Sequence, residues 1–294
     1  MKVLQWCRAN AMPVIAVLAA AVTAVFVPPD SAYLGYYDVK TLSCLFCILA
    51  VVCALRGAGL FPLLAQRLVR AFHTARSAVT ALVVVTLIGS MLLTNDTALI
   101  LACCLLIPRE TLTVPAQETP VDKRRCIVYG LLFCTAAAMV LRGIPYWLGL
   151  AVITAALLVL DRRALLGVDW GLLVTFAAFF TFSGNMARME PVRTLFRQLL
   201  AHGTMPVAAL TSQVISNVPA AILLSRFTDD YRGLLVGVNI GGAGTLVASL
   251  ASLITFREYT KHVKGQTGRF MVLFSAISFG FLGVLLVAMT LWMR

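Results

Sequence analysis

The sequence predicts an all-α polytopic membrane protein built from inverted repeats, with two re-entrant hairpins and a broken helix. Hydrophobic residues make up 61% of the 294 residues and charged residues 12%, against roughly 25% charged residues in a soluble domain. Two apolar segments are each interrupted by a polar cluster, and a third contains four glycines and an asparagine within nine residues. We expect a single transmembrane domain over residues 1–294.

Composition also limits the expected partners and cofactors. The formal charge of +12 could suggest a nucleic-acid partner, but basic residues in a membrane protein mostly occupy cytoplasmic loops and set the topology. Most of the eight cysteines lie inside apolar runs, where cysteine behaves as a small hydrophobic residue. Cys44 and Cys47 form a CxxC without a second pair or an accompanying histidine. We therefore expect no nucleic-acid partner, no transition metal and no cofactor.

The first expected elements are two spans and a surface helix. A short basic start favours a cytoplasmic N-terminus, and residues 11–28 are expected as a retained span because no small-residue cleavage site follows them. A second span is expected at 41–55. Residues 59–73 place large apolar residues at every fourth position with arginines off that stripe, which predicts an amphipathic helix along the cytoplasmic interface.

A long apolar segment at 77–107 predicts the first re-entrant hairpin. Its 31 residues are many for one crossing and too few for two. Folding the segment back also keeps more basic residues on the cytoplasmic side than an ordinary crossing would. With the preceding span it completes repeat 1, at about 41–107. The expected tip of this hairpin is a polar cluster made of Thr94, Asn95, Asp96 and Thr97.

A scaffold helix pair at 126–160 is expected to separate the repeats. It follows a polar cytoplasmic loop at 108–125, and its two spans are expected at 126–141 and 146–160. An Asp-Arg-Arg sequence after the second span returns the chain to the cytoplasmic side by the positive-inside tendency.

Repeat 2, at about 168–256, is expected to have the same layout as repeat 1. Its parts are a span at 168–183, an amphipathic helix at about 187–201, a hairpin at 205–225 with its tip at 216–219, and a span at 233–256. The glycine-rich residues 237–245 are poor helix material, so this span is expected to be unwound at its centre. A final span at 270–292 would place the C-terminus outside.

The polar interruptions are the candidate site, because polar groups in the middle of apolar segments are costly unless they face protein or a water-filled cavity. Broken helices place helix N-termini and free carbonyls at the midplane, where substrate and coupling ion bind in secondary transporters. The expected substrate-binding residues are Thr94, Asn95, Thr97, Ser216, Asn217, Val218 and Pro219. The expected ion-binding residues are Asp96, Asn239, Gly241, Gly242, Gly244 and Thr245, with Na+ as a possible ion.

Each part of this site has a plainer alternative. The tip residues are also good helix caps, although capping does not explain why such caps occur twice at membrane depth. Asp96 is the one carboxylate expected inside the bilayer, and it also fits a hairpin tip wetted by cytoplasmic water. The glycines also fit close helix packing through small residues, although Asn239 and Thr245 add ligands that packing does not require.

Three motifs resemble those of the ion-transporter superfamily that contains bacterial arsenite permeases, D-type sodium/proton antiporters, and citrate and divalent anion permeases. They are the tip at 94–98 (TNDTA), the tip at 212–220 (SQVISNVPA) and the break at 239–245 (NIGGAGT), and the resemblance covers about 30–107 and 126–292. It implies a homodimer of scaffold and transport domains that works by an elevator-like movement. Hairpin tips and unwound helices would bind substrate and coupling cation between them.

The sequence departs from this family in repeat 1. In the family, the first hairpin is followed by its own unwound span and then by a return span. Here the loop at 108–125 leads directly into the expected scaffold pair. The chain is therefore expected to be shortened by two spans, which leaves the first cation half-site without its facing loop.

These observations predict a multi-pass secondary transporter of the bacterial cytoplasmic (inner) membrane. It would carry a small anion, either a carboxylate or an oxyanion, coupled to Na+ or H+. One alternative is a shortened, transport-incompetent membrane protein of the same family. A second is an intramembrane enzyme, but hydrolysis would require paired carboxylates, a histidine-assisted nucleophile or an HExxH motif at membrane depth. We therefore do not expect an enzyme.

Overall fold

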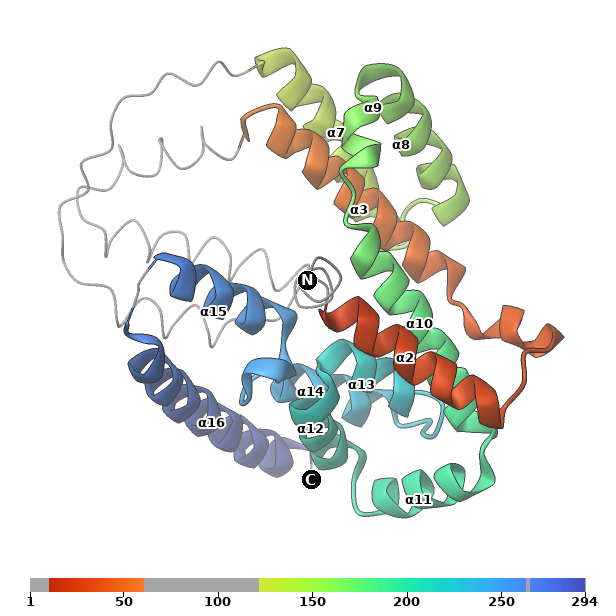
Figure 1. The fold of residues 1–294 in the computed structure, drawn as a ribbon, viewed down its shortest axis with the longest axis vertical. Coiled ribbons are helices and arrows are strands. Elements are labelled where there is room, and N and C mark those ends of the chain that lie inside the picture. The colour runs from red at the N-terminus through yellow and green to blue at the C-terminus, as the bar shows by residue number, and fades with distance from the viewer. Residues whose placement is uncertain (1–10, 61–121, 263–264, 294) are drawn as a thin grey trace, which may run out of the picture. The chain divides into compact units, whose positions relative to one another are not determined.

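Helices account for every regular element in the part of the chain that this computed structural model describes, namely residues 11–60, 122–262 and 265–293 (Figure 1). The predicted all-α class is confirmed. Three of these helices are long and apolar enough to cross a membrane: Val39–Gly57, Trp170–Arg188 and Thr267–Trp292. Shorter apolar helices accompany them, so the chain is an all-α membrane protein.

The described residues divide into two units, which meet in sequence between Asn185 and Met186. The first unit begins with α2 (Ala11–Phe26), η1 (Ser31–Tyr36) and α3 (Val39–Gly57). Asp38 begins α3 because its side chain accepts the N–H of Thr41 at 3.1 Å. Helices α2 and α3 occupy the two segments expected as the first spans.

The first unit continues with α7 (Lys123–Val140), α8 (Tyr146–Leu160), α9 (Arg162–Leu166) and most of α10 (Trp170–Arg188). The bounds of α8 coincide with the expected span at 146–160. Helix α7 begins earlier than expected, within the segment assigned to the polar loop. The reason is that Asp122 accepts the N–H of Arg125 at 3.2 Å and so caps the helix.

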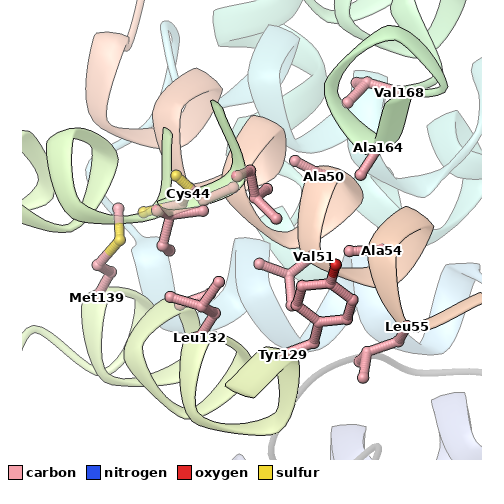
Figure 2. Packing of buried hydrophobic residues seen from close by; sticks show 14 of the residues in the cluster. Cys44, Ala50, Val51, Ala54, Leu55, Tyr129, Leu132, Met139, Ala164 and Val168 are labelled. Carbon is pink, nitrogen blue, oxygen red and sulfur yellow. The ribbon is translucent and has the colours of Figure 1, made fainter. Parts of the chain in front are cut away.

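An apolar core holds α3, α7, α8 and α9 together (Figure 2). Buried residues of α3 return every three or four positions and so form one stripe along the helix. Cys47 belongs to this stripe, and Met139 of α7 and Ile153 of α8 are likewise fully buried. A β carbon at Gly149 would overlap the side chain of Met139, so glycine allows α8 to lie close to α7.

The second unit contains α11 (Glu190–Ala201), α12 (Thr204–Ile215), α13 (Asn217–Leu224) and α14 (Tyr231–Gly241). Its remaining elements are η2 (Leu246–Ala248), α15 (Leu250–His262) and α16 (Thr267–Trp292). Leu200, Ala208, Leu224 and Leu234, from α11 to α14, share one buried cluster. These helices therefore form a common core that fixes the positions of the helix ends described below.

The expected hairpin at 205–225 is a pair of helices that folds back on itself. The chain breaks at Ser216, between α12 and α13. The hydroxyl of Thr204, at the start of α12, lies 3.5 Å from that of Thr228, just beyond α13. Because both ends of the segment meet, it cannot be one continuous helix.

The glycine-rich break differs in position from the prediction. The expected unwound residues were 237–245, but α14 continues through Asn239 to Gly241, and the irregular backbone begins at Gly242. The physical reason lies in packing, which is described with the site below. The expected surface helix at 59–73 lies almost entirely outside the described residues, as does the whole of the first hairpin at 77–107.

Candidate functional site

The turn between α12 and α13 is built on a strained residue. Ser216 has φ +75° and ψ 154°, a region that side-chain-bearing residues rarely adopt and that costs on the order of 1–3 kcal/mol. The residue is only 1% exposed, and its hydroxyl donates to the carbonyl of Ala248 at 3.3 Å. The turn is thus held against the segment that follows the break in α14.

The N-terminus of α13 leaves donors available. The Oδ1 atom of Asn217 accepts the backbone N–H of Val218 at 2.9 Å, and Pro219 brings no N–H to the first turn. Within the described residues, neither the backbone N–H of Asn217 nor its side-chain amide donates a hydrogen bond. These N–H groups lie at the positive end of the helix dipole, where an anion is stabilised.

Gln213 organises the break in α14, although it was not among the predicted site residues. Its Nε2 atom donates to the carbonyls of Gly241 at 2.8 Å and of Ala243 at 2.9 Å. Its Oε1 accepts the backbone N–H of Thr245 at 2.8 Å, and its own carbonyl accepts the Thr245 hydroxyl at 2.8 Å. One side-chain amide therefore pairs three backbone groups around the end of the broken helix.

This set of contacts, from Gln213 to Gly241, Ala243 and Thr245, is called the Gln213 clamp below. The argument that selected Ser216 and Asn217 also applies to Gln213, because it is a polar residue inside an apolar segment. Gln213 stands three residues before Ser216 within the quoted 212–220 motif. The sequence therefore marked Gln213 as a candidate, but it did not show that the hydrogen-bond partners of Gln213 are backbone groups.

The four glycines between residues 237 and 244 fall into two groups with different physical roles. A β carbon at Gly237 would lie 2.4 Å from the carbonyl oxygen of Met205, and one at Gly241 would lie 2.8 Å from the Cα atom of Ala209. These two glycines, four residues apart, let α14 approach the backbone of α12. This is the small-residue packing that was the alternative interpretation, and it applies to Gly241 but not to the whole predicted set.

The second group of glycines belongs to the break itself. Gly244 has φ +118°, and a β carbon there would overlap Oε1 of Gln213. Such a φ favours glycine because other residues meet steric strain there. At Gly242, a β carbon would lie 3.2 Å from Nδ2 of Asn217. Gly242 therefore lets the Asn217 side chain come close to the α14 break.

The two breaks are thus in direct contact in the second unit. Ser216 reaches Ala248, and Asn217 lies against Gly242. The predicted residues that come together here are Ser216, Asn217, Gly242, Gly244 and Thr245, with Val218 and Pro219 continuing into α13. Asn239 stands apart in helical backbone, half-buried, and its side chain forms no hydrogen bond within the described part of the chain.

The remaining predicted site residues cannot be placed in this arrangement. Thr94, Asn95, Asp96 and Thr97 lie outside the described residues. The described site therefore consists of the second hairpin and the α14 break alone. The N–H groups at the start of α13 suit an anion. The carbonyl oxygens of the irregular segment beside them suit a hard cation.

Comparison with known proteins gives two relatives. Inner membrane protein YbiR of Escherichia coli (strain K12) is 34% identical over 180 residues, which cover 58% of this chain and 46% of YbiR. Uncharacterized transporter MJ0456 of Methanocaldococcus jannaschii is 39% identical over 106 residues, which cover 36% of this chain and 30% of that protein. The matches thus span less than half of either relative. No protein-family model and no solved structure matches the chain.

Proposed function

We propose that this chain is a membrane transporter, and not an enzyme, that carries a small anion across the cytoplasmic membrane with Na+ or H+ as the coupling ion. The observation that carries the proposal is the contact between two helix breaks, at Ser216 and at Gly242, in one unit. Broken helices of this kind form substrate and ion sites in secondary transporters. The likeness to a protein named as a transporter supports the transporter part of this proposal.

The anion, a carboxylate or an oxyanion, would bind at the start of α13. Asn217 offers its backbone N–H and its side-chain amide there, and both are without an acceptor among the described residues. A helix N-terminus favours negative charge through these N–H groups and through the helix dipole. The proposed substrate residues Thr94, Asn95 and Thr97 would complete the pocket from the first hairpin.

The coupling cation would bind to oxygen atoms near the α14 break. Gly241 and Thr245 already contribute to the Gln213 clamp, but a carbonyl oxygen has a second lone pair that can still ligate an ion. The Asn239 side chain supplies an oxygen with no hydrogen-bond partner among the described residues. Asp96 would add the negative charge, and a second copy of the chain would support an elevator-like movement.

The test is uptake of labelled carboxylates and oxyanions into proteoliposomes under imposed Na+ or H+ gradients. Gradient-driven uptake of one anion class is the expected result, and collapse of the Na+ or the H+ gradient identifies the coupling ion. Absence of gradient-dependent uptake for every anion would contradict the proposed function and favour a transport-incompetent protein.

The location of the anion site is tested by Asn217→Asp, which keeps the size of the side chain and its capping oxygen but adds a negative charge. We expect uptake to fall by more than about tenfold, because juxtaposed like charges cost several kcal/mol. Gln198→Glu is the matched control, since Gln198 is exposed on α11. Equal uptake by both variants would place the anion elsewhere.

A further inference from the structure

A pocket in the first unit combines basic and apolar walls. It lies at the start of α7 and the end of α8 and has a volume of about 480 Å³. Its lining residues are Asp122, Arg124, Arg125, Val128, Tyr129, Val159 and Leu160. The charged residues occupy the first turn of α7, and the apolar ones continue along the two helices. The pocket is therefore amphipathic along its length.

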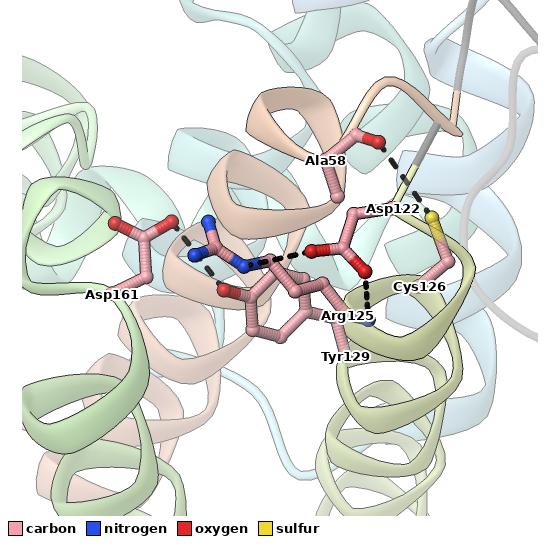
Figure 3. A network of polar contacts seen from close by, with 6 residues as sticks. All are labelled: Ala58, Asp122, Arg125, Cys126, Tyr129 and Asp161. Atoms are coloured by element: carbon pink, nitrogen blue, oxygen red, sulfur yellow. Dashed lines mark hydrogen bonds and ion pairs between the residues drawn. The ribbon is translucent and has the colours of Figure 1, made fainter. Parts of the chain in front are cut away.

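Asp122, which lines this pocket, and Asp161, which follows the lining residue Leu160, are both already engaged (Figure 3). Asp122 caps α7 and pairs with the Arg125 guanidinium at 3.1 Å. Asp161 accepts the backbone N–H of Arg163 at 3.1 Å, and the Tyr129 hydroxyl lies 3.5 Å from its other oxygen. Asp122 thus caps α7 and Asp161 caps α9. Of the neighbouring arginines, only Arg125 forms an ion pair with either acid among the described residues.

The arginines leave a positive excess at this end of the two helices. Arg124 lines the pocket and forms no ion pair within the described residues. Arg125 has one exposed carboxylate partner, and exposed pairs of this kind contribute little to stability. Arg162 follows the pocket residue Leu160 and is exposed. A ligand with negative charge could therefore bind these side chains without displacing a buried ion pair.

We propose that this pocket binds an anionic phospholipid. The phosphodiester would receive the Arg124 and Arg125 guanidinium groups, whose planar forks match phosphate oxygens. An acyl chain would lie along Val128 and Val159, the second of which is 85% exposed. Basic pockets between membrane helices are typical binding places for anionic lipid headgroups.

The apolar wall is the reason to favour a lipid over a free phosphate ion. A free ion would use only the arginines and would leave Val159 and Leu160 without a role. Ile127 and Leu131 continue the exposed apolar surface of α7 away from the charged turn. Because these side chains would face hydrocarbon, a lipid bound by its headgroup has an apolar path for its chain.

The experiment is native mass spectrometry of the full chain in detergent, titrated with phosphatidylglycerol and, separately, with phosphatidylcholine. We expect retained phosphatidylglycerol adducts and few phosphatidylcholine adducts. Arg124→Gln should weaken phosphatidylglycerol binding about fivefold, from the contribution of one arginine near an anionic lipid. Arg142→Gln, which removes one charge beyond the other end of α7, is the matched control and should bind as the original chain does.

Two results would overturn the proposal. One is equal binding of phosphatidylglycerol by the Arg124→Gln and Arg142→Gln variants, which would show that lipid binds without the pocket. The other is displacement of the lipid by inorganic phosphate at comparable concentration, which would identify a phosphate site instead. Circular dichroism and a single size-exclusion peak for both variants show that the comparison is made on folded protein. Arg124 is exposed, so its replacement is compatible with folding.

Discussion

The two units of this protein hold their helices together by different means. In the first unit, α3, α7 and α8 are unbroken, and fully buried apolar residues such as Met139 and Ile153 fill the space between them. In the second unit, α12 and α14 also pack closely, but both are followed by breaks. The Gln213 clamp joins the last turn of α12 to the break after α14 through hydrogen bonds between a side chain and the backbone.

This difference has a particular meaning in a membrane. Lipid tails are as apolar as leucine, so apolar packing between helices gains van der Waals contact but little solvent-driven free energy. An unpaired backbone group in hydrocarbon costs several kcal/mol. We therefore expect the Gln213 clamp to contribute more to the free energy of unfolding than the apolar contacts of the first unit. The break after α14, which we propose as part of the transport site, is held by the amide of Gln213.

Gln213→Met is expected to have the largest effect. The thioether has a similar size but cannot donate to Gly241 and Ala243 or accept from Thr245. A fully buried group left unpaired costs about 1–3 kcal/mol. Three partly buried groups lose their partner here, so we expect a loss of about 3 kcal/mol in the free energy of unfolding. The measurement is titration with sodium dodecyl sulfate followed by circular dichroism.

The control for this change is Gln198→Met, because Gln198 is an exposed glutamine of α11 in the same unit. It should change the free energy of unfolding by less than about 0.5 kcal/mol. If both methionine variants unfold alike, the α14 break does not depend on the Gln213 clamp.

Ile153→Ala tests the first unit by the same titration. Ile153 is 0% exposed within the α3, α7 and α8 core, and its truncation leaves a cavity that costs about 2–5 kcal/mol in water-soluble proteins. We expect a value near 2 kcal/mol here, since the transfer contribution is small in a lipid-like solvent. Val152→Ala, at a neighbouring exposed position of α8, should cost much less. A loss larger than that of Gln213→Met would reverse the proposed ranking of the two units.

Gly241→Ala separates glycine used for packing from glycine used for flexibility. A methyl group at this position would meet the backbone of Ala209 at 2.8 Å, and overpacking costs about 1–3 kcal/mol. The better helix propensity of alanine offsets up to about 1 kcal/mol of this. Gly283→Ala in α16, where the added carbon meets nothing within 4 Å, should stabilise the protein instead. Thermal unfolding in detergent measures both, and a stabilising Gly241→Ala would contradict close packing of α12 and α14.

The sequence is informative where local chemistry decides the structure. Residues 146–160 are bounded by turn residues and are α8 to the residue. The break at 216–219 is found at Ser216, because serine, asparagine and proline together favour the start of a helix. These features depend on neighbours in the chain, which the sequence displays directly.

Features that depend on distant partners are harder to predict. Low helix propensity places Gly237 and Gly241 in an unwound segment, but contact with α12 keeps both within α14. Propensity alone cannot distinguish a glycine that allows close approach from one that allows unwinding. Gln213 was overlooked for a related reason, since its partners are backbone atoms 28 and 30 residues away.

The smallest expected effect concerns the strained turn at Ser216. There we expect the glycine variant to be more stable than the alanine variant, which is the reverse of the order in an ordinary helix. In an ordinary helix, alanine is more stable than glycine by about 1 kcal/mol, and we expect this order at Ser43, a buried residue of α3. At Ser216 both substitutions lose the hydroxyl that donates to Ala248, but only glycine relieves the positive φ. Ser216→Gly should therefore be more stable than Ser216→Ala by about 1 kcal/mol. Detergent unfolding of the four variants measures the two differences. The same order at both sites would contradict backbone strain at Ser216, in the turn between α12 and α13.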